Sequence, residues 1–448
     1  MSKTALFWLI AYTSGSVLAL FNPVYGIYTY FLDYYAHPPL RWWGKGLPHL
    51  RWSFIAAIIT LAAFFLHRRK LPPLTLKSHP QTRWLICLFL TALAVSPFSV
   101  WPEKNWESLL ELGKLIVLYF LIINTVRTRT DFRILILLHI LGGLYWGYDA
   151  FSNPHRVAGR LVNIGGPDTL NDNQTAAHLL ILLPLAGVNL ISGKWWEKAI
   201  SILAIPFLIN TFILCNSRGG FLALLGMSVM ALIIAKGKAR FHAALGIVAG
   251  AAIFFFLVDP QFISRQLSTL EYEADTSATG RLDSWIGALE LIRDHPLGTG
   301  GGGFDYLSPI YIPEIVEAHR EKGYRYRTVH NTYLLAGSEW GVLGLIFFLS
   351  FIGSTFKEQN RIRTALALDR EGRRMQLESI ALILGYVGVL TAGIFINRSY
   401  AESIYWLAAF TAILRNLHAE HFKKVNKRTV VSPENDGLTR MTSSYDVS

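Results

Sequence analysis

The sequence predicts an all-α protein that crosses a membrane as a polytopic bundle of about twelve helices. Of the 448 residues, 52% are hydrophobic and only 16% are charged, and long apolar runs recur from one end to the other. A helix of about twenty residues spans the roughly 30 Å hydrocarbon core, and its backbone groups are satisfied internally, as lipid requires. A membrane barrel would instead need alternating strands of about ten residues, which these unbroken runs do not resemble.

Twelve apolar runs are the predicted membrane spans. They cover residues 4–21, 53–66, 84–101, 109–126, 132–151, 174–192, 199–215, 221–235, 242–258, 333–356, 377–396 and 402–414. A secretory signal peptide is the alternative for the first run, but no small-residue cleavage pattern follows it, so we expect a retained helix. If the count is wrong, we expect a missed pair, such as a re-entrant segment near residues 22–35.

The distribution of charge predicts the orientation of the bundle. Twelve crossings place both termini on one side, and the loops there carry nineteen Lys and Arg residues against eight in the opposite short loops. Cytoplasmic loops are enriched in these residues, so both termini are predicted to be cytoplasmic. The net charge of +12 is explained by this bias, and no basic stripe interleaved with aromatic residues indicates nucleic-acid binding. Cys87 and Cys215 lie near opposite faces and are not expected to pair.

Four regions follow from this topology. Residues 1–258 hold the first nine helices, residues 259–331 form a large external loop between helices 9 and 10, residues 332–416 hold the last three helices, and residues 417–448 form a cytoplasmic tail. Loops of this length in compact domains are usually functional. Within the loop, residues 280–295 have apolar residues at helical spacing. The tail is basic and then rich in Ser, Thr and Asp, which predicts disorder.

Two arginines on the external face are candidates for binding an anion. Arg218 lies at a helix mouth in the motif Asn216-Ser217-Arg218-Gly219-Gly220, where two glycines allow close approach of a phosphate. The alternative is an interfacial arginine that reaches the lipid headgroups. Arg281 opens a predicted amphipathic helix, where the dipole mildly disfavours a cation, so a ligand role competes with a solvated surface charge.

His330 is the candidate base. A neutral histidine can take a proton from a hydroxyl, although a single histidine is more often structural. It ends the long loop just before the tenth predicted helix, and Glu339 follows nine residues later. Glu339 either orients the base or neutralises Arg218, because a carboxylate inside a membrane normally has a partner.

Weaker candidates surround these residues. Asn331 and Asp283 stand beside His330 and Arg281 and are candidates for support or acceptor binding. Asn171 and Asn173 precede the sixth predicted span, where they contact sugar hydroxyls or cap the helix. The glycines at 298 and 300–303 lack the Lys-Ser or Lys-Thr of a phosphate loop and predict a flexible or tightly turned connection. No Asp-x-Asp motif is present, so we predict no metal and no other cofactor.

Several of these motifs together resemble a known family, the bacterial O-antigen ligases and related polymerases, from about residue 153 to residue 344. The matching pieces are Asn216-Ser-Arg-Gly-Gly, Gly280-Arg281 with Trp285, His295-Pro-Leu-Gly-Thr-Gly, and His330-Asn331 followed by Gly341 and Gly344. The segments Gly166-Pro-Asp-Thr-Leu-Asn-Asp-Asn and Asn22-Pro-Val-Tyr-Gly are similar to the O-glycosylation ligases associated with exosortase systems.

The resemblance implies a metal-independent, inverting glycosyltransferase of the bacterial cytoplasmic membrane. Such proteins take a glycan from a polyprenyl diphosphate carrier at the periplasmic face, in the synthesis of lipopolysaccharide or other surface polysaccharide. Arg218 and Arg281 are then expected to hold the diphosphate, and His330 to activate the acceptor hydroxyl. Lipid A-core, a growing glycan and a protein all remain open as acceptors, so ligase, polymerase and protein O-oligosaccharyltransferase are alternatives.

Transport of a lipid or polysaccharide is the competing class of function, and a non-catalytic assembly partner is a third. A transporter predicts charges near the middle of its spans and broken helices in corresponding halves. Here the conspicuous charges lie at external helix mouths and in one loop. Glu111 and Lys114 fall within the fourth predicted span, but near its external end and at a spacing that lets them neutralise each other.

Overall fold

The computed structural model describes residues 1–69, 71, 79–157, 159–258, 263, 276–320, 325–367 and 369–431. Most of these residues are helical, and the short strands β1 (Arg156–Val157) and β2 (Arg160–Leu161) pair antiparallel. The first helices are α1 (Lys3–Phe21), α2 (Val24–Ala36), η1 (Pro38–Leu40), η2 (Trp42–Gly46), α3 (Trp52–Leu66), α4 (Pro80–Val95), η4 (Ser96–Phe98), α5 (Pro102–Thr125) and α6 (Arg129–Ser152). The later ones are α7 (Asp172–Ser192), α8 (Trp195–Cys215), α9 (Arg218–Ile234), α10 (Lys238–Leu257), α12 (Thr276–Asp294), α13 (Gly303–Tyr311), α14 (Pro313–Arg320), α15 (Thr332–Thr364), α16 (Arg370–Ala392) and α17 (Glu402–Val431).

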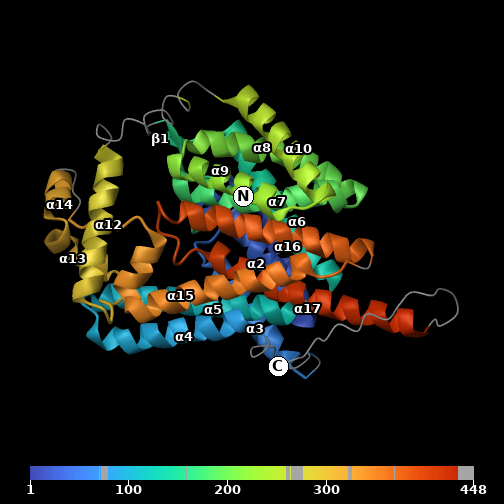
Figure 1. Ribbon diagram of the computed structural model, residues 1–448, viewed down its shortest axis with the longest axis horizontal. Helices are drawn as coiled ribbons and strands as arrows, with labels where there is room; N and C mark the ends of the chain where they lie inside the picture. The colour runs from blue at the N-terminus through green and yellow to red at the C-terminus, as the bar shows by residue number, and fades with distance from the viewer. Residues whose placement is uncertain are drawn as a thin grey trace.

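The long helices lie side by side in one bundle, with α12, α13 and α14 gathered at one end of it (Figure 1). We name that end the loop end and the other the opposite end. Within the bundle, α7 packs against α8 and α16, while α15 packs against α4 and α16. The described residues 276–320 and 325–331, between α10 and α15, therefore lie at one set of helix ends.

The predicted fold class is confirmed in its main features. Nine helices in the described part of the chain are long and apolar enough to cross a membrane, and α3 and α9 are shorter apolar helices. Each of the twelve predicted spans overlaps a helix of the structure. The protein is an all-α polytopic bundle, and the number of helices that cross the bilayer stays a prediction.

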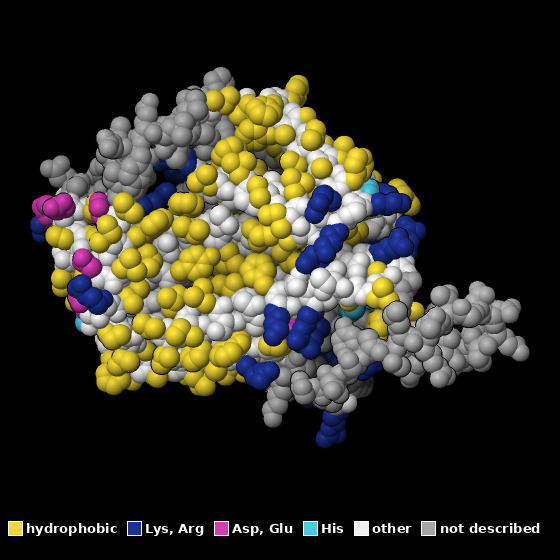
Figure 2. All heavy atoms as spheres, in the orientation of Figure 1, with side chains coloured by type: hydrophobic (Ala, Val, Ile, Leu, Met, Phe, Trp, Pro, Cys, Tyr) yellow, Lys and Arg dark blue, Asp and Glu magenta, His cyan; other side chains and the backbone are white. Residues whose placement is uncertain are grey.

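The outer surface of the bundle is suited to lipid. Figure 2 shows a broad hydrophobic face, with many Lys and Arg side chains gathered at the right of the view, away from α12 to α14. Helix α10 has no buried residue, and its Phe255 and Phe256 are 73% and 88% exposed. Rings exposed to this extent are unfavourable in water but not in a hydrocarbon solvent.

Helix α2 was not predicted as a membrane span. Most of its residues are buried, because it packs against α1, α3 and α6. Small residues allow these close approaches: Gly15 of α1 faces Thr29, and Gly26 faces Thr60 of α3. Since protein covers α2, it can hold five tyrosines and Asp33, whose carboxylate accepts a hydrogen bond from the Ser53 hydroxyl.

The direction of α2 fixes where the chain begins. Its early residue Tyr28 lies 3.1 Å from the Asp131 carboxylate at the start of α6, and its late residue Tyr35 accepts from Trp146 Nε1 at 2.8 Å, so α2 and α6 run parallel. Helix α1 runs antiparallel to α2. Accordingly, the Ser2 hydroxyl donates to the Trp43 carbonyl just after α2. The chain therefore starts at the end of the bundle where α6 finishes.

The first and last described residues lie at opposite ends of the bundle. Helix α6 leads into β1, which Figure 1 shows toward the same end as α12. Helix α17 runs the other way, and its His421 Nε2 lies 2.9 Å from Asp369 Oδ1 at the start of α16. In the described residues, the start of α1 and the end of α17 therefore lie at opposite ends, whereas both termini were predicted to share one side. The difference comes from α2, a helix that was not among the twelve predicted spans. The side of a membrane on which each terminus lies stays a prediction.

The predicted disordered tail is helical in its first part. Helix α17 continues to Val431, whereas the last predicted span ends at residue 414. Beyond the apolar part, Lys424 Nζ pairs with Glu420 Oε1 at 2.6 Å, one helical turn apart, and such pairs support an exposed helix. The prediction is wrong for residues 417–431, and residues 432–448 lie outside the described residues.

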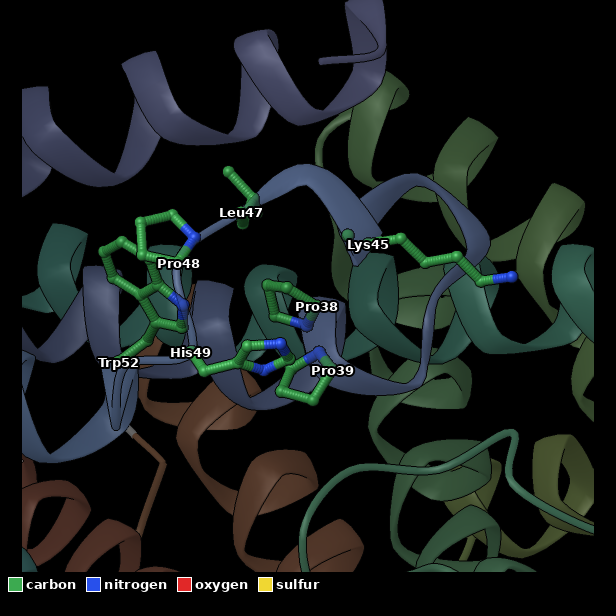
Figure 3. Close-up of a pocket in the computed structure, with 8 residues that line it drawn as sticks. Pro38, Pro39, Lys45, Leu47, Pro48, His49 and Trp52 are labelled. Carbon is green, nitrogen blue, oxygen red and sulfur yellow. The ribbon is translucent and has the colours of Figure 1, made fainter.

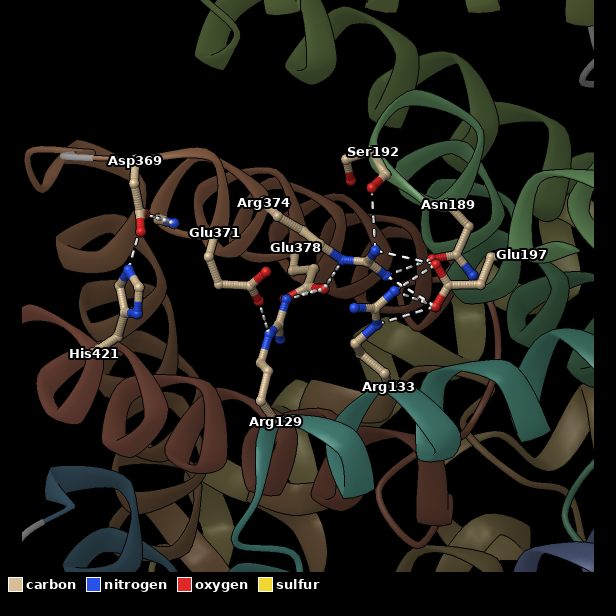
Figure 4. A network of polar contacts seen from close by, with 11 residues as sticks. Arg129, Arg133, Asn189, Ser192, Glu197, Asp369, Glu371, Arg374, Glu378 and His421 are labelled. Carbon is tan, nitrogen blue, oxygen red and sulfur yellow. Dashed lines mark hydrogen bonds and ion pairs between the residues drawn. The ribbon is translucent and has the colours of Figure 1, made fainter. Parts of the chain in front are cut away.

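Buried charges at the opposite end are paired across several helices (Figure 4). Arg374 of α16 and Arg133 of α6 bind the same carboxylate, that of Glu197 in α8, at 3.1 Å and 2.8 Å. Arg374 also donates to Asn189 Oδ1 of α7 at 3.2 Å. An unpaired buried charge is costly, so this network constrains how α6, α7, α8 and α16 meet.

A glycine turn at the loop end fits into a kink in α15. Gly341 has φ of +69° and interrupts the helix, and Val342 N donates instead to the Pro296 carbonyl at 2.9 Å. On the other side of the kink, Thr299 N and Gly300 N donate to carbonyls of α15 at 3.0 Å and 2.9 Å. The glycine-rich segment is thus a tight turn, one of the two predicted alternatives, and it holds α15 in a fixed shape.

The position of the N-terminal residues can be tested with single cysteines. In a chain carrying Cys87→Ser and Cys215→Ala, we expect Lys3→Cys and Glu314→Cys to react with a membrane-impermeant maleimide from the same side. Lys357→Cys should react only from the other side. The start of α1 and helix α14 lie at the loop end, whereas Lys357 lies near the far end of α15. Equal protection of Lys3→Cys and Lys357→Cys in intact spheroplasts would contradict the direction assigned to α1.

The kink in α15 can be tested with two glycines of one helix. Gly341→Ala should lower the thermal unfolding temperature in detergent, because φ is positive and an added Cβ would lie 2.4 Å from the backbone of Leu297. With ψ of −174°, Gly341 lies in a backbone region that is essentially open to glycine only, and such a conformation alone costs roughly 1–3 kcal/mol for another residue. Gly353→Ala is the control, since nothing lies within 4 Å of its added Cβ. Equal stability of the two variants would show that the kink carries no constraint.

Candidate active site

The turn between α8 and α9 presents Arg218 at the loop end. Asn216 ends α8 in the left-handed conformation, with φ of 50°, which asparagine tolerates better than most residues. Ser217 then caps α9, and its hydroxyl accepts from Gly220 N at 3.1 Å. Arg218 is therefore the first residue of α9, beside the N–H groups of the first helical turn, a position that favours anions.

The two glycines after Arg218 allow close packing of α9. A Cβ added to Gly219 would lie 3.0 Å from Phe395, and one added to Gly220 would lie 3.0 Å from Ala176 of α7. Larger residues would push α9 away from both neighbours. The glycines thus serve packing as well as leaving room beside the guanidinium of Arg218.

Asn173 connects α7 to this turn. Its Oδ1 accepts from the Ser217 hydroxyl at 2.7 Å and from Arg160 Nη2 at 3.1 Å. Arg160 also forms an ion pair with Asp172. Asn173 was a predicted site residue, whereas Arg160 was not, because its sequence context indicates only a charge in an external loop.

A small pocket brings Arg281 to the same place. It lies between α12 and the turn that holds Arg218. Its lining residues are Asn173, Ser217, Gly219, Gly220, Arg281, Ala392, Phe395 and Ile396. Residues from four distant parts of the chain therefore meet around one cavity.

Helix α12 positions Arg281 by packing on the bundle. It starts at Thr276, earlier than predicted, so Arg281 lies in its second turn rather than at its start. Trp285, one turn later, lies 6.2 Å from Phe395 between ring centroids. Asp283 is exposed on this helix and does not line the pocket.

The backbone around His330 is fixed by the segment between α16 and α17. Asn331 caps α15, and its side chain accepts from Leu334 N at 3.0 Å. Asn331 N in turn donates to Asn397 Oδ1 at 2.9 Å, and Thr332 N donates to the Gly393 carbonyl at 2.8 Å. His330 itself has φ of 50°, and such strained residues recur at functional sites.

The surroundings of His330 keep its ring neutral. Burial, followed by the positive charges of Arg281 and Arg327, lowers the pKa of His330 to about 4. A neutral imidazole at neutral pH can accept a proton. Arg281, which lines the pocket, therefore also lies close enough to His330 for its charge to disfavour the protonated ring.

Glu339 does not lie where its spacing from His330 suggested. It is buried, and its carboxylate accepts from Gly302 N at 2.8 Å and from the Tyr400 hydroxyl. It therefore holds the glycine turn and the segment after α16. Neither of these hydrogen-bond partners is His330 or a residue of the Arg218 turn, because Glu339 lies seven residues, or about 10 Å, along α15 from its start at Thr332.

A buried arginine that was not among the predicted site residues organises this region. Arg398 is 1% exposed, and its Nη1 and Nη2 donate to the backbone carbonyl and carboxylate of Asp168 at 2.5 Å and 3.4 Å. Asp168 also accepts from Glu402 N at 3.0 Å and from the Tyr34 hydroxyl. In the sequence, the signal for this role of Arg398 was a single arginine in a short apolar connection between two membrane helices.

Asn171 serves as a helix cap. Its side chain accepts from Gln174 N at 2.9 Å, and Gln174 returns the contact to Asn171 N at 3.5 Å, which is a capping box. This is one of the two predicted roles. Its exposure leaves the side chain at the surface of the loop end.

A larger pocket lies apart from these residues, between η1, η2 and the start of α3 (Figure 3). It is lined by Pro38, Pro39, Gly44, Lys45, Leu47, Pro48, His49 and Trp52. Figure 3 shows His49 beside the two prolines and Lys45 directed away from them. None of the predicted site residues lines it. Among the described residues, no group of three His, Cys, Asp or Glu side chains is arranged to hold a metal ion.

The arrangement can bind an anion next to a base. Guanidinium groups and helix N-terminal N–H groups suit phosphate oxygens, and a neutral histidine suits deprotonation of a hydroxyl. The anion-binding groups and the histidine lie at the same end of the helical bundle, and Arg281 is close to both.

Comparison with known proteins agrees with this chemistry. A search of curated proteins found no match. The family model described as O-antigen ligase matches residues 203–349, which run from α8 into α15 and contain Arg218, Arg281 and His330. This match supports the assignment of the chain to the O-antigen ligase family and, with it, a membrane glycosyltransferase-like role in the synthesis of surface polysaccharide.

Proposed function

We propose that this chain moves a glycan from a polyprenyl diphosphate carrier to an acceptor hydroxyl, without a metal and with inversion at the anomeric carbon. One observation carries the proposal. Arg281 lines the pocket beside the Arg218 turn and also lowers the pKa of His330, so anion-binding groups and a neutral base lie within electrostatic reach of each other.

Arg218 and Arg281 bind the diphosphate in this proposal. Guanidinium groups contact phosphate oxygens through two parallel hydrogen bonds and keep their charge at any physiological pH. As the bond between the sugar and the diphosphate breaks, negative charge grows on the departing oxygen. Fixed positive charges at that point stabilise the transition state more than the ground state.

His330 acts as the general base. It accepts the proton of the acceptor hydroxyl while the acceptor oxygen forms a bond to the anomeric carbon and the diphosphate leaves from the other face. This single displacement inverts the configuration, and the proton later passes from the imidazolium to solvent. Asn331 and Glu339 support the site through the α15 cap and the glycine turn.

The bias of Lys and Arg supports an orientation in the bacterial cytoplasmic membrane. The basic opposite end would face the cytoplasm, and the loop end with residues 259–331 would face the periplasm. The carrier lipid would reach the arginines from the outer leaflet. In this orientation α1 starts in the periplasm, and α17 leads toward the cytoplasm.

The acceptor can be lipid A-core, a growing glycan or a protein side chain, which correspond to ligase, polymerase and O-oligosaccharyltransferase activities. Asn173 lines the pocket. Asn171 and Asp283 are exposed, and each lies two residues from a pocket residue, Asn173 and Arg281 respectively. We propose these three residues as contacts for substrate hydroxyls.

Loss of the base should abolish most of the activity. We expect His330→Ala in proteoliposomes to transfer glycan from a polyprenyl diphosphate donor about 10²–10⁴ times more slowly than wild type, with chelator present throughout. His155→Ala, an exposed histidine at the loop end, should transfer normally. Full activity of a folded His330→Ala protein would show that His330 is structural.

The pH dependence of kcat/KM is a second test of His330 as the general base. The base is active when neutral, and a lowered pKa keeps it neutral to lower pH, so kcat/KM should stay level down to about pH 5 and fall as the pH approaches 4. Arg327→Gln removes one positive charge near His330, so the fall should move to higher pH. A wild-type fall centred near pH 6.5 that Arg327→Gln leaves unchanged would count against this base.

The role of the pocket beside Arg281, named here the arginine pocket, in binding the diphosphate can be tested with two arginines of α12. Arg281→Lys should lower kcat/KM for the donor by about 10² or more, because lysine loses the bidentate contact with phosphate. Arg293→Lys is the matched control, since Arg293 lies on the same helix, is mostly exposed and pairs with its neighbour Asp294. Polyprenyl diphosphate without a glycan should compete with the donor for wild type and Arg293→Lys, but only weakly for Arg281→Lys. Equal inhibition of all three proteins would place the diphosphate elsewhere.

A further inference from the structure

A cluster of three aromatic rings lies at the loop end, outside the arginine pocket. The ring centroids of Trp101, Tyr306 and Tyr326 are 5.4 to 6.0 Å apart, and the two tyrosine rings are stacked at 24°. Tyr306 and Tyr326 are nevertheless 42% and 40% exposed. Rings that pack together usually bury their faces in a core. This cluster instead forms an open aromatic platform, which consists of these three residues.

The platform is built on the rigid glycine turn. A Cβ added to Gly302 would lie 2.4 Å from Lys104 and 3.5 Å from Trp101, so the turn packs directly beneath the platform. Gly302 N is held by the Glu339 carboxylate at 2.8 Å, and Gly301 N by Asn105 Oδ1 at 2.9 Å. The rings therefore stand on backbone that is fixed before any ligand arrives, as a pre-formed binding site requires.

The platform is joined to the proposed base by a short stretch of chain. Tyr326 and His330 are four residues apart in a segment without helix or strand, so at about 3.3 Å per residue their Cα atoms are no more than about 13–14 Å apart. The segment is held on its way: Arg327 N donates to the Ser308 hydroxyl at 2.9 Å, and Thr328 accepts from Asn397 Nδ2. A ligand on the platform can therefore extend to His330.

The platform and the arginine pocket are formed by different elements. The pocket lies among α7, α9, α12 and the end of α16, whereas the platform lies among the start of α5, α13 and the segment before α15. Figure 1 shows the loop-end tips of α4 and α5 with α13 at the lower left, away from α8 and α9. If the diphosphate binds beside Arg281, the platform is formed by other elements and stays free for the acceptor.

We propose that Trp101, Tyr306 and Tyr326 bind a sugar ring of the acceptor. The C–H face of a pyranose stacks on aromatic rings. The inference rests on the proposed function, since it specifies that the acceptor is a glycan.

The test measures glycan binding without donor, so that it does not depend on transfer. The probe is deacylated surface glycan from the source bacterium, titrated against the full-length protein in nanodiscs. Tyr306→Leu and Tyr326→Leu keep apolar volume but lose the ring, and we expect each to weaken binding by about tenfold. Tyr306→Phe should bind nearly as wild type. Tyr148→Leu is the control, because Tyr148 is an exposed tyrosine of α6 and not part of the platform.

The outcomes separate this inference from the proposed function. In transfer assays the leucine variants should raise KM for the acceptor while KM for the donor stays unchanged. Binding of a Ser/Thr peptide in place of the glycan, or equal glycan binding by wild type and both leucine variants, would overturn the inference. If glycan binding depends on the tyrosine rings but the protein transfers no glycan, the binding site on the platform stands and the proposed glycosyltransferase function is wrong.

Discussion

The loop end depends on the burial of one guanidinium group. Arg398 is almost inaccessible, so its charge must be met inside the protein, and Asp168 meets it through both its carbonyl and its carboxylate. This contact joins the loop before α7 to the segment between α16 and α17. That segment also receives N–H groups from Asn331 and Thr332, which fixes the residue before them, His330. The position of the proposed base thus follows from a polar contact far from it in sequence.

The glycine turn is the second organiser of the site. Its N–H groups take the place of helix hydrogen bonds at the kink in α15, and the Glu339 carboxylate holds Gly302 from inside the helix. The turn connects α12, which carries Arg281, to α13, which carries Tyr306 of the aromatic platform. One rigid connection therefore sets the distance between the proposed donor and acceptor sides. Such a function requires glycine, because Gly298, Gly300 and Gly302 all have positive φ.

Sequence patterns predicted the elements that lipid constrains. A helix that faces hydrocarbon must be long and apolar, so all twelve predicted spans overlap helices of the structure. The same reasoning failed for α2, because a helix covered by protein need not be apolar and can hold Asp33 and several tyrosines. It failed again at the end of α17, where exposed ion pairs extend a helix beyond its apolar part. Helical periodicity alone also could not place Glu339, since spacing gives a face and a depth but no partner.

The sequence by itself determined the membrane class, the position of the large loop in the chain and the motifs that contain Arg218, Arg281 and His330. Each of these is local, because hydrophobic length and motif spacing are read along the chain. Only the tertiary structure decided that Asn173, the Arg218 turn and Arg281 line one pocket, and that Arg398 and Asp168 hold the neighbouring segments together. It also decided that α1 begins at the loop end. These features depend on which buried polar groups find partners, and Arg398 and Asp168 lie 230 residues apart in the sequence.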